Sequence, residues 1–169
     1  IRQIFPSEQL GPVMRFDPAT SRRNIQMGYY DTMRFMRELP GQLYYFSEKA
    51  DGFAAFAALP ENAIKAAGIP LRLPEGLSPR RALFEHILPA VAAELRLPRE
   101  AGYDDLLLAL LEHRAEQLGI GRFRWYTPAQ LQAVIAESTA LPEEPRRPLL
   151  RSRPLEAAEI LAAALPLLG

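Results

Sequence analysis

Residues 24–32 read NIQMGYYDT and lie inside a segment whose apolar residues recur with the period of a helix. Spacings of four, four and three residues put one set on a single helix face: Ile25, Tyr29, Met33 and Met36. A second apolar set lies largely away from that face: Met27, Tyr30 and Phe35. A helix that is apolar on more than one side is expected to pack between two layers, so losing either layer would expose a patch that favours dimerisation.

The helix around this stretch is predicted to begin near residue 22 and to end at Pro40-Gly41. Residues 1–20 are predicted to be extended, with a strand from Ile1 to Phe5. A strand needs a partner for its backbone groups, and two are open: residues 42–46 (QLYYF), or a sheet that precedes this chain. The chain starts at Ile1 rather than at Met, so we expect it to be part of a longer polypeptide.

The rest of the chain alternates helical segments with short, proline-rich loops. Helices are predicted to begin at five places: Pro60-Glu61, Ser78-Pro79, Pro98, Thr127 and Ser152-Arg153-Pro154. Thr127 and Gln130 form a capping-box pattern, and Pro89 is expected to kink the second of these helices. The sequence therefore predicts a mainly α fold, a compact bundle of five or six helices with a short N-terminal β element. Residues 139–154 contain four prolines and are predicted to be a linker.

Composition sets limits on the class of protein. The chain has 169 residues, of which 49% are hydrophobic, and its formal net charge is zero. These values fit one soluble globular domain and give no electrostatic reason for nucleic acid as a partner. There is no cysteine, which excludes disulfides, thiolate metal sites and cysteine nucleophiles and agrees with a cytoplasmic location. The longest apolar run, Ile160 to Leu168, is far shorter than the ~20 residues of a membrane-spanning helix.

The chemistry-bearing residues form no recognisable catalytic pattern. None of the six serines lies in a G-x-S-x-G turn: Ser7, Ser21, Ser47, Ser78, Ser138 and Ser152. His86 and His113 each follow a glutamate, but H-E-x-x-H is absent, as are the glycine-rich phosphate-binding motifs. We therefore predict no catalytic residue, no cofactor-binding residue and no metal ligand, and we expect Ser78 and Ser152 to cap helices.

Two surface patterns leave alternatives open. Residues 120–126 (IGRFRWY) interleave arginine with aromatic residues, so nucleic-acid bases could stack there, but a packed loop between two helices is the favoured interpretation. Four arginines precede the last apolar helix and resemble a membrane-surface anchor: Arg146, Arg147, Arg151 and Arg153. Glu156 and Glu159 on that helix favour the alternative, a basic linker before a core helix.

Several short segments together resemble bacterial patatin-like phospholipases. They are Ile4-Phe5-Pro6-Ser7, then Arg15-Phe16-Asp17, then residues 24–32, and finally Tyr44-Tyr45-Phe46. In that family a last sheet strand of the form I-x-P is followed by a loop, and then by a helix around N-I-x-x-G-Y-x-D-T. The resemblance covers residues 1–46 and is most specific over residues 24–32.

Patatin-like enzymes are lipid acyl hydrolases with a Ser-Asp dyad, and their catalytic motifs precede the region matched here. Asp51-Gly52 is the chain's only Asp-Gly pair and lies after that region, so no catalytic residue is carried over. The resemblance implies that residues 1–46 end a patatin-like region and that residues 47–169 form a helical C-terminal domain. That domain would cover or regulate an upstream catalytic domain of the same chain. The alternative is a free-standing helical module that binds a protein partner or a membrane surface. A homodimer is a separate partner prediction, from the apolar patch on the helix around residues 24–32.

Overall fold

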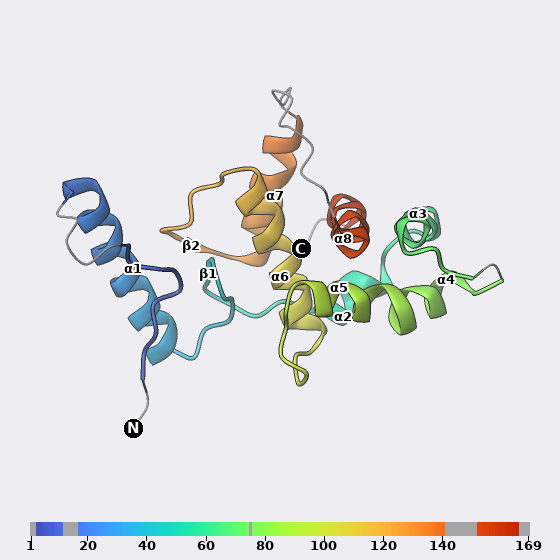
Figure 1. Cartoon of the computed structure of the whole chain (residues 1–169), viewed down its shortest axis with the longest axis horizontal. Coiled ribbons are helices and arrows are strands. Elements are labelled where there is room, and N and C mark those ends of the chain that lie inside the picture. The colour runs from blue at the N-terminus through green and yellow to red at the C-terminus, as the bar shows by residue number, and fades with distance from the viewer. Residues whose placement is uncertain (1–2, 12–16, 75, 141–151, 166–169) are drawn as a thin grey trace.

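The computed structural model describes residues 3–11, 17–74, 76–140 and 152–165 (Figure 1). The described chain is mainly helical with a short two-stranded parallel sheet, which confirms the predicted fold class. The elements are α1 (Pro18–Met36), β1 (Tyr45–Phe46), α2 (Gly52–Ala57), α3 (Glu61–Leu71), α4 (Pro79–Arg81), η1 (Ala82–Ile87), α5 (Leu88–Glu94), α6 (Tyr103–Gln117), β2 (Trp125–Tyr126), α7 (Pro128–Ala140) and α8 (Arg153–Ala164). None of the helices in these residues is long and apolar enough to cross a membrane.

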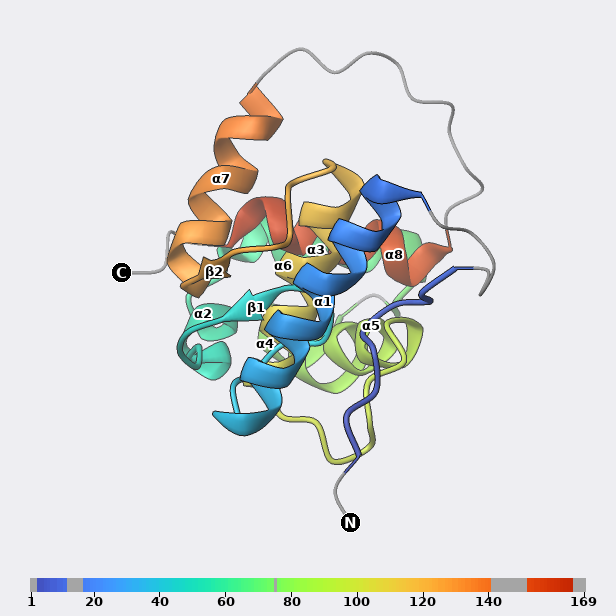
Figure 2. The same ribbon diagram turned by 90° about the vertical axis from the view of Figure 1, so that its left-hand side faces the viewer.

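Helix α1 lies at one end of the molecule, and α3 and α4 lie at the other (Figure 1). Helix α1 begins at Pro18, earlier than predicted, because Asp17 caps it. The Asp17 carboxylate accepts hydrogen bonds from the Thr20 backbone N–H at 2.9 Å and from the Thr20 hydroxyl at 2.8 Å. The helix ends at Met36, before the predicted stop at Pro40-Gly41. Figure 2 shows α1 in front of β1, β2 and α6.

The strand predicted for Ile1 to Phe5 is wrong for the residues described there. Residues 3–5 belong to no strand, and the side chains of Ile4 and Phe5 are exposed. Instead β1 pairs in parallel with β2, with Tyr45 opposite Trp125 and Phe46 opposite Tyr126. Strand β1 lies in the predicted segment 42–46, but its hydrogen-bonding partner comes from the second half of the chain.

Helix α6 is the centre of the core. Its buried residues point in several directions: Leu106, Leu107, Leu108, Leu110, Leu111 and Ala115. Helices α2, α7 and α8 pack around it, and α8 also packs closely on α3 (Figure 1). A central helix with neighbours on several sides is expected to be apolar nearly all round.

The helix predicted from Ser78 contains an unexpected wide turn. Ser78 caps its start, as predicted, but residues 82–87 form the π-helix η1 immediately before Pro89. Proline has no backbone N–H, and its ring would clash with the carbonyl of Glu85 four residues earlier. The wider turn avoids that clash, and the Leu88 backbone N–H bonds to the Leu83 carbonyl instead of continuing the α pattern.

Helix α2 was not predicted, because Asp51-Gly52 resembles a turn. Asp51 instead caps the helix by accepting the Ala54 backbone N–H at 2.9 Å. Gly52 is buried against α6, where an added Cβ would lie 2.1 Å from the Tyr103 carbonyl oxygen. Glycine is therefore needed for the close approach of α2 to α6.

The later helix boundaries largely follow their caps. The Thr127–Gln130 capping box is present in both directions, at 3.0 and 3.1 Å, and α7 continues to Ala140. Ser152 caps α8, as predicted. Most of the predicted linker, residues 141–151, lies outside the described residues. The proposed boundary between residues 46 and 47 stays a prediction.

Candidate functional site

A buried aspartate on α1 is the centre of the densest polar network in the described residues. The Asp31 side chain is 3% exposed and accepts four hydrogen bonds. The donors are the Ser7 backbone N–H at 2.9 Å, the Ser7 hydroxyl at 3.1 Å, the Tyr45 hydroxyl at 3.0 Å and the Arg34 guanidinium at 3.0 Å. A buried carboxylate is stable only with such partners, so Asp31 joins the N-terminal segment, α1 and β1.

Arg122, from the loop before β2, closes the network from the other side. Its guanidinium pairs with Glu8 and donates to the Ser7 hydroxyl at 2.6 Å. It also lies over the Phe123 ring, 5.3 Å from the centroid. Glu8 pairs with Arg23 as well, so one carboxylate bridges a residue of α1 and a residue of the β2 loop. The Nε atom of Arg122 is buried and has no hydrogen-bond partner in the part of the chain that the structure describes.

Ser7 and Asp31 place a serine hydroxyl beside a carboxylate, an arrangement that resembles a hydrolase dyad. The sequence did not predict this contact, and its geometry favours a structural role. The Ser7 hydroxyl donates its one hydrogen to Asp31 and accepts from Arg122, so both groups that hold it are parts of the network. The Tyr45 hydroxyl lies 3.3 Å from it and donates its own hydrogen to Asp31. An acyl transfer also needs hydrogen-bond donors for the developing oxyanion. The backbone N–H of Ser7 is occupied by Asp31, and the surrounding residues 3–11 form no helix whose N–H groups could serve.

The phenol of Tyr45 has the protonation state that the network requires. Burial raises the pKa of Tyr45, and the nearby Asp31 carboxylate raises it further, although the hydrogen bond with Ser7 lowers it in part. The hydroxyl therefore remains protonated and donates to Asp31. The ring of Tyr45 stacks on Tyr30 with centroids 4.8 Å apart.

The aromatic residues of the segment 120–126 pack against other rings. Phe123 and Trp125 both lie against Tyr30, with centroids 6.3 and 5.4 Å apart. Tyr126 is buried and donates its hydroxyl hydrogen to the Gly121 carbonyl at 2.5 Å. These contacts agree with a packed loop rather than an open platform on which bases could stack.

A second buried carboxylate lies in α6. One oxygen of Glu112, a residue only 5% exposed, accepts the backbone N–H groups of Gln42, Leu43 and Tyr44 at 2.8, 2.9 and 2.9 Å. Gly41 makes this approach possible, because its φ is +97° and an added Cβ would lie 3.0 Å from the same oxygen. Glu112 therefore fixes the turn that leads into β1.

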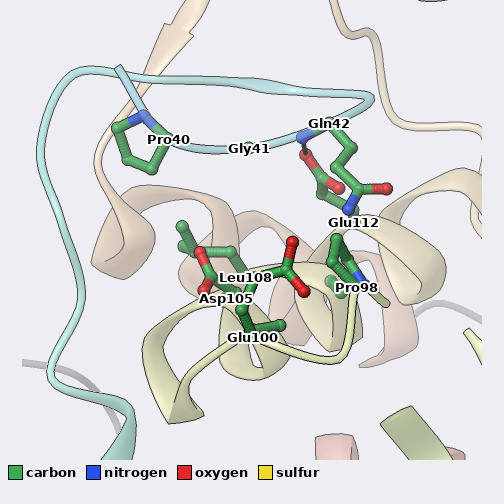
Figure 3. A pocket seen from close by; sticks show the side chains of 10 residues that line it. Pro40, Gly41, Gln42, Pro98, Glu100, Asp105, Leu108 and Glu112 are labelled. Carbon is green, nitrogen blue, oxygen red and sulfur yellow. Dashed lines mark hydrogen bonds between the residues drawn. The ribbon is translucent and has the colours of Figure 1, made fainter. Parts of the chain in front are cut away.

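A pocket of about 280 Å³ opens beside Glu112. Figure 3 shows the loop at Pro40, Gly41 and Gln42 on one side of it and the carboxylates of Glu100 and Asp105 on the other. Asp105 accepts the Gly102 backbone N–H at 2.9 Å, which caps α6. No group of three or more acidic, histidine or cysteine side chains among the described residues could hold a metal ion.

Glu112 gives a testable dependence of stability on pH. Burial raises the pKa of its carboxyl, and the three backbone N–H groups offset this only in part. A folded-state pKa above the unfolded value means that the folded protein holds the proton more tightly. This contribution is therefore fully present below the ordinary value of 4.5 and is lost as pH rises through the folded pKa. We expect the wild type to lose stability relative to Glu112→Gln over that window, as measured by urea unfolding across pH; a difference that grows with pH in favour of the wild type would contradict this.

The other predicted residues are dispersed. His86 is exposed on η1, whereas His113 on α6 lies 3.1 Å from the Gln117 amide nitrogen, which also bonds to Glu159 at 2.8 Å. Ser152 bonds to Glu94 as well as capping α8. Arg153 is exposed, and Arg146, Arg147 and Arg151 lie outside the described residues.

Asp31 and Glu112 were missed by the sequence analysis, although each left a signal. Asp31 lies four residues after Met27 on the buried side of α1, and Glu112 follows a run of six residues that contains five leucines. A single carboxylate on an otherwise apolar helix face indicates a buried acceptor. Arg122 gave no comparable signal, because its partners are 77 and 115 residues away in sequence.

Comparison of the chain with protein-family models, with curated proteins and with solved structures finds no match.

Proposed function

We propose that this chain is the non-catalytic C-terminal helical region of a bacterial patatin-like lipid acyl hydrolase, where it covers or regulates the catalytic domain. The Asp31 network carries the proposal, because three separate parts of the resembling pattern meet in it. Ser7 follows Ile-Phe-Pro, Asp31 belongs to Gly-Tyr-Tyr-Asp-Thr, and Tyr45 belongs to Tyr-Tyr-Phe. Contact among all three supports their being one structural unit rather than three chance similarities.

The uncovered side of α1 supports a catalytic domain of the same polypeptide as the partner. Ile25, Tyr29 and Met36 are 72%, 57% and 71% exposed and follow one side of the helix, which we call the α1 stripe. The opposite side carries the buried residues Met27 and Asp31. An apolar stripe of this kind marks a contact surface, and the proposal assigns it to the hydrolase domain. We also propose a cytoplasmic location, which the absence of cysteine supports.

Esterase assays test the catalytic part of the proposal. We expect the isolated chain to hydrolyse no p-nitrophenyl butyrate, and its Ser7→Ala variant to be indistinguishable from it. The longer polypeptide encoded by the gene should carry G-x-S-x-G and D-G-[GA] before residue 1 and should be active. Activity of the isolated chain that is lost on Ser7→Ala would overturn the proposal, as would a gene without those motifs.

Charge substitutions in the longer polypeptide test the contact. Ile25→Glu combined with Tyr29→Glu should lower esterase activity or release the helical region to limited proteolysis. Ile69→Glu is the matched control, because Ile69 is 75% exposed at the far end of the molecule, on α3. Equal effects of the double variant and the control would contradict a contact through the α1 stripe.

The alternative is a free-standing interaction module. The same α1 stripe favours it, because a second copy could cover this surface. A membrane-binding version through the last helix is less favoured, because α8 buries Ala157, Ala158 and Leu161 in the core. Sedimentation equilibrium of the isolated chain and of its Ile25→Glu variant separates a dimer from a monomer. Co-sedimentation with anionic vesicles at low salt tests whether the chain binds a membrane surface.

A further inference from the structure

An apolar groove lies far from the α1 stripe. It has a volume of about 550 Å³ and is lined by residues of η1, α5, the first turn of α6 and the loop that joins α5 to α6. This volume falls within the ~300–1,000 Å³ typical of small-molecule sites. Leu88 of α5 and Leu106 of α6 line its walls and are 1% and 4% exposed.

The wall chemistry limits what the groove can hold. Apart from Arg99 and the Tyr103 hydroxyl, its lining side chains are apolar, including Phe84, Ala92 and Leu97. The Gly102 backbone N–H is already used by Asp105. A peptide, sugar or nucleotide would lose hydrogen bonds to water there and regain few, which is unfavourable. The groove therefore suits a hydrocarbon chain.

Arg99 places a cation at this groove. Arg99 is exposed, and within the described ranges its guanidinium makes no hydrogen bond or ion pair. Among the residues that the structure describes, no other charged side chain lines the groove. Glu100 and Asp105 line the pocket on the other side of the loop, beside Glu112 (Figure 3). A guanidinium beside an apolar groove is complementary to a carboxylate at the end of an acyl chain.

Aromatic residues extend the apolar surface beyond the groove. Phe53 and Tyr103 are 57% and 40% exposed, and both rings pack against Phe84, with centroids 5.7 and 5.5 Å away. Phe84 belongs to η1, the π-helix that precedes Pro89. Phe84 also lines the groove, so the groove lies at a π-helical turn. Turns of this kind occur often at functional sites.

The geometry points to a binding site for a single long-chain acyl carboxylate, with the hydrocarbon chain in the groove and the carboxylate on Arg99. The site does not depend on the proposed function, since binding to the isolated chain is the only quantity measured. Its failure would therefore leave the esterase and α1-stripe experiments untouched.

Fluorescence titration of the delipidated chain with cis-parinaric acid tests the groove, with hexadecanoate as competitor. Ala93→Trp fills the groove from an exposed position of α5, and Ala163→Trp on α8 is the matched control, because Ala163 is also exposed and helical. We expect saturable binding by the wild type and the control, and binding at least about tenfold weaker in Ala93→Trp, a loss of the hydrocarbon site. Circular dichroism confirms that both variants are folded.

Arg99→Gln tests the head group, and Arg37→Gln, at another exposed arginine, is its control. We expect Arg99→Gln to weaken hexadecanoate binding about threefold, as for an exposed ion pair, and to leave hexadecanol binding unchanged. The assignment is overturned if no saturable binding is found, or if Ala93→Trp binds as well as Ala163→Trp. Equal affinity of Arg99→Gln and the wild type for hexadecanoate would overturn the role of Arg99.

Discussion

Replacing Asp31 with alanine should lower the free energy of unfolding by about 4 kcal/mol, the typical loss when one member of a buried ionic network is removed. The substitution leaves the Ser7 N–H and the Tyr45 hydroxyl without the Asp31 acceptor, and the Arg34 guanidinium keeps only its bonds to the Gly41 and Gln42 carbonyls. Each of these donors is largely shielded from water, so the lost bonds are only partly replaced by hydration. Urea unfolding followed by circular dichroism measures the change.

Two further variants give the scale against which the stability loss of Asp31→Ala is judged. Asp51→Ala removes an exposed helix cap, so it should lower the unfolding free energy by only about 1 kcal/mol. Ser7→Ala removes one neutral donor from the network and should also cost about 1 kcal/mol. A loss in Asp31→Ala no greater than that in Asp51→Ala would show that the network contributes little to stability.

The helices were predictable because their signals are local. Capping residues identified three helix starts. Ser78 caps α4, which continues into η1 and α5, Thr127 caps α7 and Ser152 caps α8. The apolar period of α1 correctly indicated a helix with two apolar sides, yet it could not say which side is buried. Met27 is fully buried whereas Ile25 is exposed, and the packed side of α1 meets residues such as Trp125 of β2, which lies much later in the chain.

The sheet and both buried carboxylates depend on distant contacts. Strand β1 joins β2 across 80 residues, and two residues per strand carry no periodicity that a sequence could display. The strand signal at Ile4-Phe5 is real in composition, but the segment is held by Ser7 through side-chain and backbone bonds to Asp31 rather than by a ladder. Fixed pairings of this kind follow from the assembled fold and not from local propensity.

Replacing Glu112 with leucine should lower the free energy of unfolding by about 3 kcal/mol, because one buried and two partly buried backbone N–H groups lose their shared acceptor at once. Leucine is similar in size and fits an apolar helix face, so the loss comes from the orphaned donors rather than from a cavity. Glu112→Gln keeps an acceptor oxygen and should lose only about 1 kcal/mol. Glu116→Leu, one turn later on the exposed side of α6, should change the unfolding free energy by less than about 0.5 kcal/mol.

Hydrogen exchange gives this prediction a local test that global unfolding cannot. The amides of Gln42, Leu43 and Tyr44 point at one oxygen, so in Glu112→Leu they should exchange much faster than the amides of α7. The turn they form leads directly into β1, so weakening of the β1–β2 pair should follow. Uniform acceleration of exchange throughout the chain would instead mean that Glu112 supports the whole core, and unchanged exchange at all three amides would mean that water replaces the carboxylate without loss.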